Sequence, residues 1–145
     1  TVTDDAYVRS DLPTSTSGNA ASLRVRTSSS LTIRSYLKIT ISGLSGPANA
    51  TLRLYVADAT PGTISAHPVA DTSWSEATLT WSNGPPLGSA IATTPAASLG
   101  SWVELNLGSI PGNGTFSFAL TNNNGDVAWF DSTEATNKPH IILTP

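Results

Sequence analysis

The stretch IRSYLKI, residues 33 to 39, carries the alternation that decides the fold. One parity of this stretch is mostly apolar, whereas the other parity holds Arg34, Tyr36 and Lys38. Successive side chains of a β-strand point to opposite faces, so a period of two is typical of a strand that is buried on one face only. The stretch therefore predicts a half-buried strand whose outer face carries positive charge and a tyrosine.

Short strands are predicted along the whole chain, and helices are not. Proline, glycine, serine and threonine interrupt every window long enough to show a helical period of 3.6 residues. The segments with strand patterns are 5–10, 21–27, 34–41, 50–56, 63–69, 77–81, 101–107, 114–121, 126–131 and 139–144. Pro68 indicates that its segment is an edge strand or an irregular stretch, and the Gly- and Pro-rich segment 82–100 is expected to be a long ordered crossover. About ten short strands with polar turns predict an all-β, antiparallel β-sandwich.

The composition limits the classes of protein to which the chain can belong. A length of 145 residues fits one domain, and we expect a single domain over residues 1–145. The absence of cysteine excludes disulfides, thiolate metal sites and cysteine nucleophiles. The net charge of −3 and the lack of a long apolar run predict neither a nucleic-acid partner nor a membrane-spanning segment.

The basic residues are concentrated in the first third of the chain, and only Lys138 lies far from the others. In four predicted strands the alternation places the apolar side chains in the core and the basic and tyrosine side chains outside. These outward residues are Tyr7, Arg9, Arg24, Arg26, Arg34, Tyr36, Lys38, Arg53 and Tyr55. Arginine and lysine bind carboxylates and sulfates, and a tyrosine ring packs against the apolar face of a sugar. The pattern therefore favours an acidic polysaccharide as the ligand.

Two other arrangements of these cations stay open. Polar outer faces are usual in a sandwich, and the cations would then form structural ion pairs with carboxylates. The carboxylates considered for such pairs are Asp58, Asp71, Glu76 and Glu104. Consecutive strands that alternate between the two sheets would also divide the basic residues between two surfaces.

The tryptophans add one candidate to the binding residues. Trp74 and Trp81 are expected in the core, because a Trp in a repeated apolar pattern is usually buried. Trp102 instead shares a strand face with the polar residues Glu104 and Asn106. Trp102 is therefore the second candidate for a residue that stacks on a sugar ring.

Several segments, in a fixed order, resemble a known family. They are DAYVRSD (5–11), LRVR (23–26), RSYLKITISGL (34–44), ATLRLYV (50–56), VADTSWSEATLTWSNGPPLG (69–88), GSWVELNL (100–107) and STEATNKPHIILT (132–144). Together they resemble the DNRLRE domain, also classed as carbohydrate-binding module family 96. The most specific piece consists of Trp74, Glu76, Leu79, Thr80 and Trp81. The resemblance implies a β-sandwich of jelly-roll type, an accessory role in secreted bacterial enzymes or surface proteins that act on polysaccharides, and alginate binding for some members.

Calcium in a structural role is the expected metal, because jelly-roll carbohydrate modules often hold one through carboxylates and carbonyls. Asp4 and Asp5 near the start would meet Asp131 and Glu134 near the end if the terminal strands are adjacent. The other interpretation is that these four carboxylates are solvated turn residues.

The function predicted from the sequence is a non-catalytic module that binds an acidic polysaccharide, with alginate or another polyuronate first. We expect the module to be attached to other domains of a larger secreted bacterial protein. One alternative is a structural or adhesive spacer domain of a large surface protein. Another is a polysaccharide lyase built on Tyr36, Arg34 and Lys38, which is disfavoured because the Q-I-H or Q-V-H motif and the Y-F-K-A-G-like strand of small alginate lyases are absent.

Overall fold

Ten β-strands build the part of the chain that the computed structural model describes, residues 1–95 and 98–145. The strands are β1 (Val2–Arg9), β2 (Ser22–Thr27), β3 (Thr32–Ile41), β4 (Ala48–Asp58), β5 (Ile64–Val69), β6 (Ala92–Thr94), β7 (Trp102–Ile110), β8 (Gly114–Asn122), β9 (Ala128–Asp131) and β10 (His140–Thr144). All strand pairings are antiparallel. Among the described residues there is no helix, and so none that is long and apolar enough to cross a membrane.

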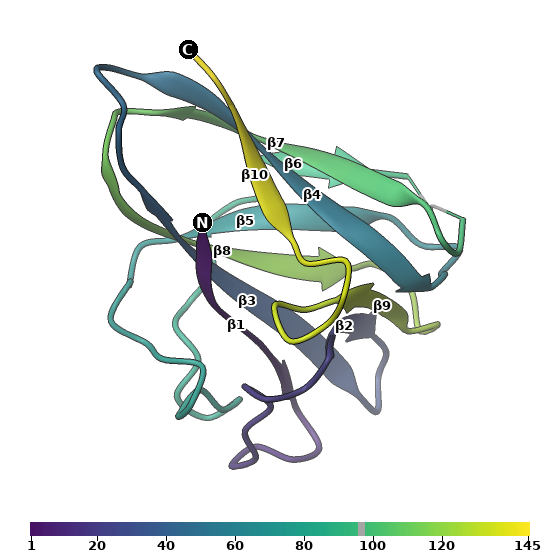
Figure 1. Cartoon of the computed structure of the whole chain (residues 1–145). Coiled ribbons are helices and arrows are strands. Elements are labelled where there is room, and N and C mark those ends of the chain that lie inside the picture. The colour runs from purple at the N-terminus through teal and green to yellow at the C-terminus, as the bar shows by residue number, and fades with distance from the viewer. Residues whose placement is uncertain (96–97) are drawn as a thin grey trace.

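The strands form two packed layers (Figure 1). In the first layer the order is β1, β3, β8, β5 and β6. In the second layer β2 pairs with β9, and β4 pairs with β9, β10 and β7. A short pairing of β2 with β3 connects the layers into one curled sheet. The antiparallel β-sandwich predicted from the sequence is therefore confirmed, and its jelly-roll connectivity stays a prediction.

The main core lies between the inner faces of the two layers. Leu37 and Ile39 of β3 belong to the same buried cluster as Leu52 and Leu54 of β4. Along each strand, one residue lies between each of these apolar residues and the next, and this alternation is the pattern that predicted the strands. The residues that alternate with these apolar residues along each strand therefore point to the two outer faces of the sandwich.

A second, smaller core lies on the outer face of the first layer. The segment 70–91, which we call the covering segment, crosses this face. Its residues Trp74 and Leu79 are buried against Ala6, Val8 and Tyr36. In the β1–β3 register Ala6 lies opposite Tyr36, so the two share one face. Two expectations are therefore wrong: Ala6 and Val8 contact the second core rather than the main one, and Tyr36 is buried, with 1% exposed, rather than facing solvent.

The covering segment also changes the predicted strand list. Residues 77–81 alternate like a strand, yet they form turns, because Leu79 and Trp81 pack on the first layer instead of joining a sheet. The short strand β6 was missed, and it lies in the segment 82–100 that was expected to be a crossover, of which residues 96 and 97 lie outside the described part. The expectation of an edge strand is wrong for β5 as a whole, because β5 pairs with both β8 and β6; Pro68 itself lies beyond the three positions that pair with β6.

Candidate functional site

The cations of β3 hold the covering segment in place. The guanidinium carbon of Arg34 lies 4.7 Å from the centre of the Trp81 ring. Lys38 Nζ donates a hydrogen bond to the carbonyl oxygen of Trp74, lies 4.8 Å from the Trp74 ring, and forms a 4.0 Å ion pair with Asp4. These two residues therefore contact the protein itself on the side where the sequence predicted a ligand.

Tyr36 completes this covered surface. Its hydroxyl donates a 2.7 Å hydrogen bond to the carbonyl oxygen of Pro85, and its ring meets the Trp74 ring edge to face at 5.8 Å. Burial raises the pKa of the Tyr36 phenol, so the hydroxyl keeps the proton that it donates. The predicted role of Tyr36 as an exposed contact to sugar is not compatible with this burial.

A second group of predicted residues gathers where β1 and β2 approach each other. The guanidinium carbon of Arg24 lies 3.9 Å from the centre of the Trp129 ring and 4.8 Å from the centre of the Tyr7 ring. Arg24 Nε donates a 3.1 Å hydrogen bond to Ser22 Oγ. Arg26 lies on the same face of β2, and Arg9 lies two residues from Tyr7 on β1. We call this set the basic cluster, and it consists of Tyr7, Arg9, Arg24, Arg26 and Trp129.

The charges of the basic cluster are only partly neutralised. Arg9 donates to both carboxylate oxygens of Asp11, at 3.0 and 2.9 Å. The pKa of Asp11 is lowered by this hydrogen bond to Arg9, with smaller contributions that include the charge of Arg26. Within the described chain, neither Arg24 nor Arg26 forms an ion pair with a carboxylate. The cluster therefore presents more positive than negative charge.

Two hollows adjoin Tyr7 of the basic cluster. One has a volume of about 380 Å³ and is lined by Tyr7, the turn at residues 16–20, Glu76 and Ala77. The other has a volume of about 110 Å³ and is bounded by Tyr7, Arg9, Leu12 and the hydroxyl-bearing residues 15–17. Hydroxyl groups and the Tyr7 phenol therefore lie beside Arg9 in the smaller hollow.

A third group occupies the outer face of the second layer. Trp102 of β7 meets Tyr55 of β4 edge to face at 5.4 Å and His140 of β10 at 5.1 Å. The guanidinium carbon of Arg53 lies 4.8 Å from the Trp102 ring, and Arg53 Nε lies 3.4 Å from Glu104 Oε1. We call this set the aromatic platform, and it consists of Arg53, Tyr55, Trp102, Glu104 and His140. The predicted binding residues are thus divided among the covered face, the basic cluster and the aromatic platform.

Three carboxylates meet at the junction of β1 with the covering segment and the segment after β9. Oxygen atoms of Asp5, Glu76 and Glu134 lie within 4.8 Å of one another. Two of the predicted metal ligands, Asp5 and Glu134, are therefore adjacent, and Glu76 joins them. The other two are not part of this group: Asp4 accepts a hydrogen bond from the Glu76 amide at 3.1 Å, and Asp131 accepts one from the Asn137 amide at 3.2 Å.

The carboxylates of Asp5, Glu76 and Glu134 lie close enough to repel one another when they are charged. Burial raises the pKa of Asp5 to about 6, although hydrogen bonds from the Thr133 amide and hydroxyl, at 2.9 and 2.7 Å, act in the opposite direction. Burial and the charge of Glu134 raise the pKa of Glu76 to about 7. Carboxylate oxygens are the ligands that calcium prefers, so these three residues fit a hard divalent cation. Either a proton or such a cation relieves their repulsion.

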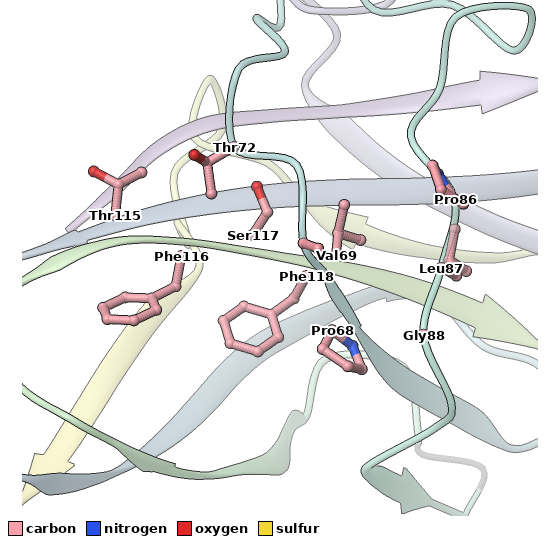
Figure 2. Close-up of a pocket in the computed structure, with 11 residues that line it drawn as sticks. Pro68, Val69, Thr72, Pro86, Leu87, Gly88, Thr115, Phe116, Ser117 and Phe118 are labelled. Carbon is pink, nitrogen blue, oxygen red and sulfur yellow. The ribbon is translucent and has the colours of Figure 1, made fainter.

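An apolar hollow of about 510 Å³ lies at the end of β5, between β8 and the covering segment (Figure 2). Its lining includes Pro68, Val69, Leu87, Phe116 and Phe118, and it contains no charged side chain. Without a cation the hollow does not fit an anionic ligand.

The comparison with protein families identifies the family to which the chain belongs. The chain matches the model of carbohydrate-binding module family 96 over residues 1–145, and it therefore belongs to this family. Its partner is accordingly a carbohydrate. The search of curated proteins found no match.

Sequence reasoning missed four residues of these groups as site residues, namely Trp129, Glu104, His140 and Glu76, although Glu104 was considered as the ion-pair partner that it is for Arg53. Trp129 has the same alternation signal as Trp102, since it stands between the buried residues Ala128 and Phe130. His140 stands directly opposite Arg53 in the β10–β4 register, which no local pattern indicates. Glu76 lies in a turn, and its approach to Asp5 depends on the path of the covering segment.

Proposed function

We propose that this domain binds an acidic polysaccharide, with alginate or another polyuronate first, through the basic cluster. We further propose that it acts as a non-catalytic module attached to other domains of a larger secreted bacterial protein. One observation carries the proposal: the Arg24 guanidinium is held between two aromatic rings and has no carboxylate partner in the described structure.

Aromatic contacts prepare Arg24 for an anionic ligand. The rings of Tyr7 and Trp129 restrict the guanidinium plane, so less conformational entropy is lost when a ligand binds. A guanidinium donates two parallel hydrogen bonds to a carboxylate, which is the group that every residue of a polyuronate carries. Arg26 and Arg9 add positive charge nearby. Contacts of this exposed kind are screened by salt, so binding weakens as ionic strength rises.

Affinity electrophoresis tests the proposal directly. The domain is run in native gels that contain alginate, pectate or a neutral glucan, and retardation is expected in the acidic gels. Arg24→Ala is expected to reduce the affinity by about tenfold, because it removes charge-assisted hydrogen bonds. Arg34→Ala is the matched control, since Arg34 contacts the covering segment and is expected to leave retardation unchanged. Unretarded migration of the wild type in both acidic gels would favour the spacer alternative and contradict the proposal.

We also propose that Asp5, Glu76 and Glu134 bind a structural calcium ion. Bound calcium would join β1, the covering segment and the segment after β9 by neutralising their three carboxylates. The ion is expected to raise the melting temperature of the protein, and EDTA is expected to lower it. Glu76→Gln should remove the effect of EDTA. An unchanged melting curve in EDTA rules the calcium proposal out.

A further inference from the structure

The aromatic platform is separate from the basic cluster and differs from it in charge. Arg53 lies opposite Glu104 in the β4–β7 register, and the two form an ion pair, whereas Arg24 forms none within the described residues. The Glu104 side chain is 57% exposed, so its carboxylate is accessible to a ligand. The platform thus offers a donor and an acceptor side by side with no strong net charge. This arrangement suits vicinal hydroxyl groups better than it suits a carboxylate.

The platform is also held rigidly. Tyr55 and His140 contact the Trp102 ring at their edges, and Arg53 Nη1 lies 3.4 Å from His140 Nε2. These side chains come from three neighbouring strands, because β4 pairs with both β7 and β10. Aromatic side chains on a rigid sheet lose little entropy on binding and present area on which the C–H face of a pyranose ring can pack.

The members of the basic cluster on β2 and β9 lie on the outer face of the second layer, as the aromatic platform does. Trp129 and Arg24 are opposite each other in the β2–β9 register, with buried neighbours on the inner face. Tyr55 lies opposite Trp102, and Asp58 lies opposite Trp129, so the two groups are three residues apart along β4. Three residues of a strand span about 10 Å. A single oligosaccharide is long enough to contact both.

We propose that the aromatic platform is a second sugar-binding station, which packs a pyranose ring against Trp102 and binds its hydroxyls through Arg53 and Glu104. One polysaccharide chain then crosses the outer face of the second layer, with carboxylates at the basic cluster and a hydroxyl-bearing ring at the platform. The acidic nature of the polymer rests on the proposed function, whereas the platform itself requires only a pyranose ring. The domain therefore binds internal segments of a polymer and favours longer oligosaccharides.

The test compares alginate with carboxyl-reduced alginate, the same polymer with neutral residues, at low and high salt. Trp102→Ala is expected to reduce the affinity for both polymers by about tenfold and to leave the salt dependence unchanged. Arg24→Ala is expected to weaken alginate binding alone and to reduce its salt dependence. Leu87→Ala, which removes an apolar side chain from the hollow between β8 and the covering segment, is the control and should bind like the wild type.

Glu104→Gln provides a second variant that does not depend on the loss of a large side chain. It removes the charge that neutralises Arg53, so alginate affinity at low salt is expected to rise a few-fold while affinity for the reduced polymer falls. Asp71→Asn makes the same charge change on the covering segment and should change neither the affinity for alginate nor that for the reduced polymer by as much.

The outcomes separate the two proposals. Binding of the reduced polymer without binding of alginate would support the platform and overturn the acidic-ligand proposal. Wild-type affinities in a folded Trp102→Ala variant would overturn the platform alone, as would a Glu104→Gln variant that behaves like Asp71→Asn. Binding of neither polymer would overturn both.

Discussion

The two outer faces of this sandwich start from the same sequence pattern and end differently. On the first layer, Arg34, Tyr36 and Lys38 lie under the covering segment and contact Trp81, Pro85 and Trp74. On the second layer, Arg24 and Arg53 also contact tryptophans, but those tryptophans come from neighbouring strands of the same layer. The first face is therefore a small core with cations at its margin, and the second is an open surface.

The difference shows that the segment from which the tryptophan comes decides whether an outward cation is covered or open to solvent. A tryptophan from a crossing segment places its own backbone over the cation, as Trp74 does over Lys38. A tryptophan from an adjacent strand lies beside the cation and leaves the space above the sheet open, as Trp129 does for Arg24. The same cation–π contact therefore holds a covering segment in one place and, in the proposed function, prepares a binding group in the other.

The largest expected effect comes from removing the tryptophan that closes the first face. Trp74 is 7% exposed and donates a 2.8 Å hydrogen bond from Nε1 to Ser117 Oγ. Trp74→Ala is expected to lower the free energy of unfolding by about 3–5 kcal/mol, as for other buried aromatic residues. Trp102→Ala on the open face is the matched comparison, and a clearly smaller loss is expected. Urea unfolding measures both, and equal losses would contradict the distinction between the two faces.

The strands were predictable from the sequence because their signal is local. Alternation such as that of β3 requires only neighbouring residues, and it placed Leu37 and Ile39 in the core correctly. The same alternation failed at residues 77–81, since Leu79 is buried and Trp81 partly buried by packing on another segment rather than by pairing in a sheet. A three-residue strand such as β6 is too short to show alternation at all.

The grouping of the candidate residues was less predictable, because it depends on contacts between distant segments. Arg24 meets Trp129 through the β2–β9 pairing, and Arg53 meets His140 through the β10–β4 pairing. Neither register is indicated by composition or spacing. The sequence therefore identified most of the cationic and aromatic residues but not which of them meet, nor that Tyr36 is buried.

A change of pH is expected to act on the junction that attaches the covering segment. The folded-state pKa of Asp5 is raised to about 6 and that of Glu76 to about 7, so the folded protein binds these protons more tightly than the unfolded chain does. Proton binding by these two groups contributes fully to the free energy of unfolding below the ordinary carboxyl pKa, and this contribution is lost as the pH rises through 6 to 7. In EDTA the melting temperature should therefore be lower at pH 8 than at pH 5, and Asp5 alone contributes about 1 kcal/mol to this difference.

Two controls accompany this pH measurement. Glu76→Gln is expected to flatten the melting profile between pH 5 and 8, because the variant side chain does not titrate. Calcium is expected to restore stability at pH 8 by replacing the protons. A melting temperature that rises from pH 5 to pH 8 in EDTA would contradict the assignment of these groups as the source of the dependence.

A pair of conservative tyrosine variants sharpens the comparison further. Tyr36→Phe removes the hydroxyl that donates to the Pro85 carbonyl on the covered face, and a loss of about 1 kcal/mol in the free energy of unfolding is expected. Tyr55→Phe makes the same change on the open face, where it should leave stability unchanged within a few tenths of a kcal/mol. Denaturant midpoints at constant slope measure the difference, and a Tyr55→Phe loss as large as that of Tyr36→Phe would remove it.

The smallest effect on stability is expected at the basic cluster. Arg9 pairs with Asp11 on the surface, where the two side chains are 28% and 40% exposed, and exposed ion pairs contribute little to stability. Arg9→Ala should therefore barely change the denaturant midpoint, yet it should weaken retardation by alginate at low salt, because it removes positive charge beside Arg24. Lys38→Ala should behave in the opposite way, with a measurable loss of stability and unchanged retardation, since Lys38 donates to the Trp74 carbonyl. A cation that stabilises the fold without contributing to binding, and another that contributes to binding without stabilising the fold, would together establish that the covering segment separates the two roles.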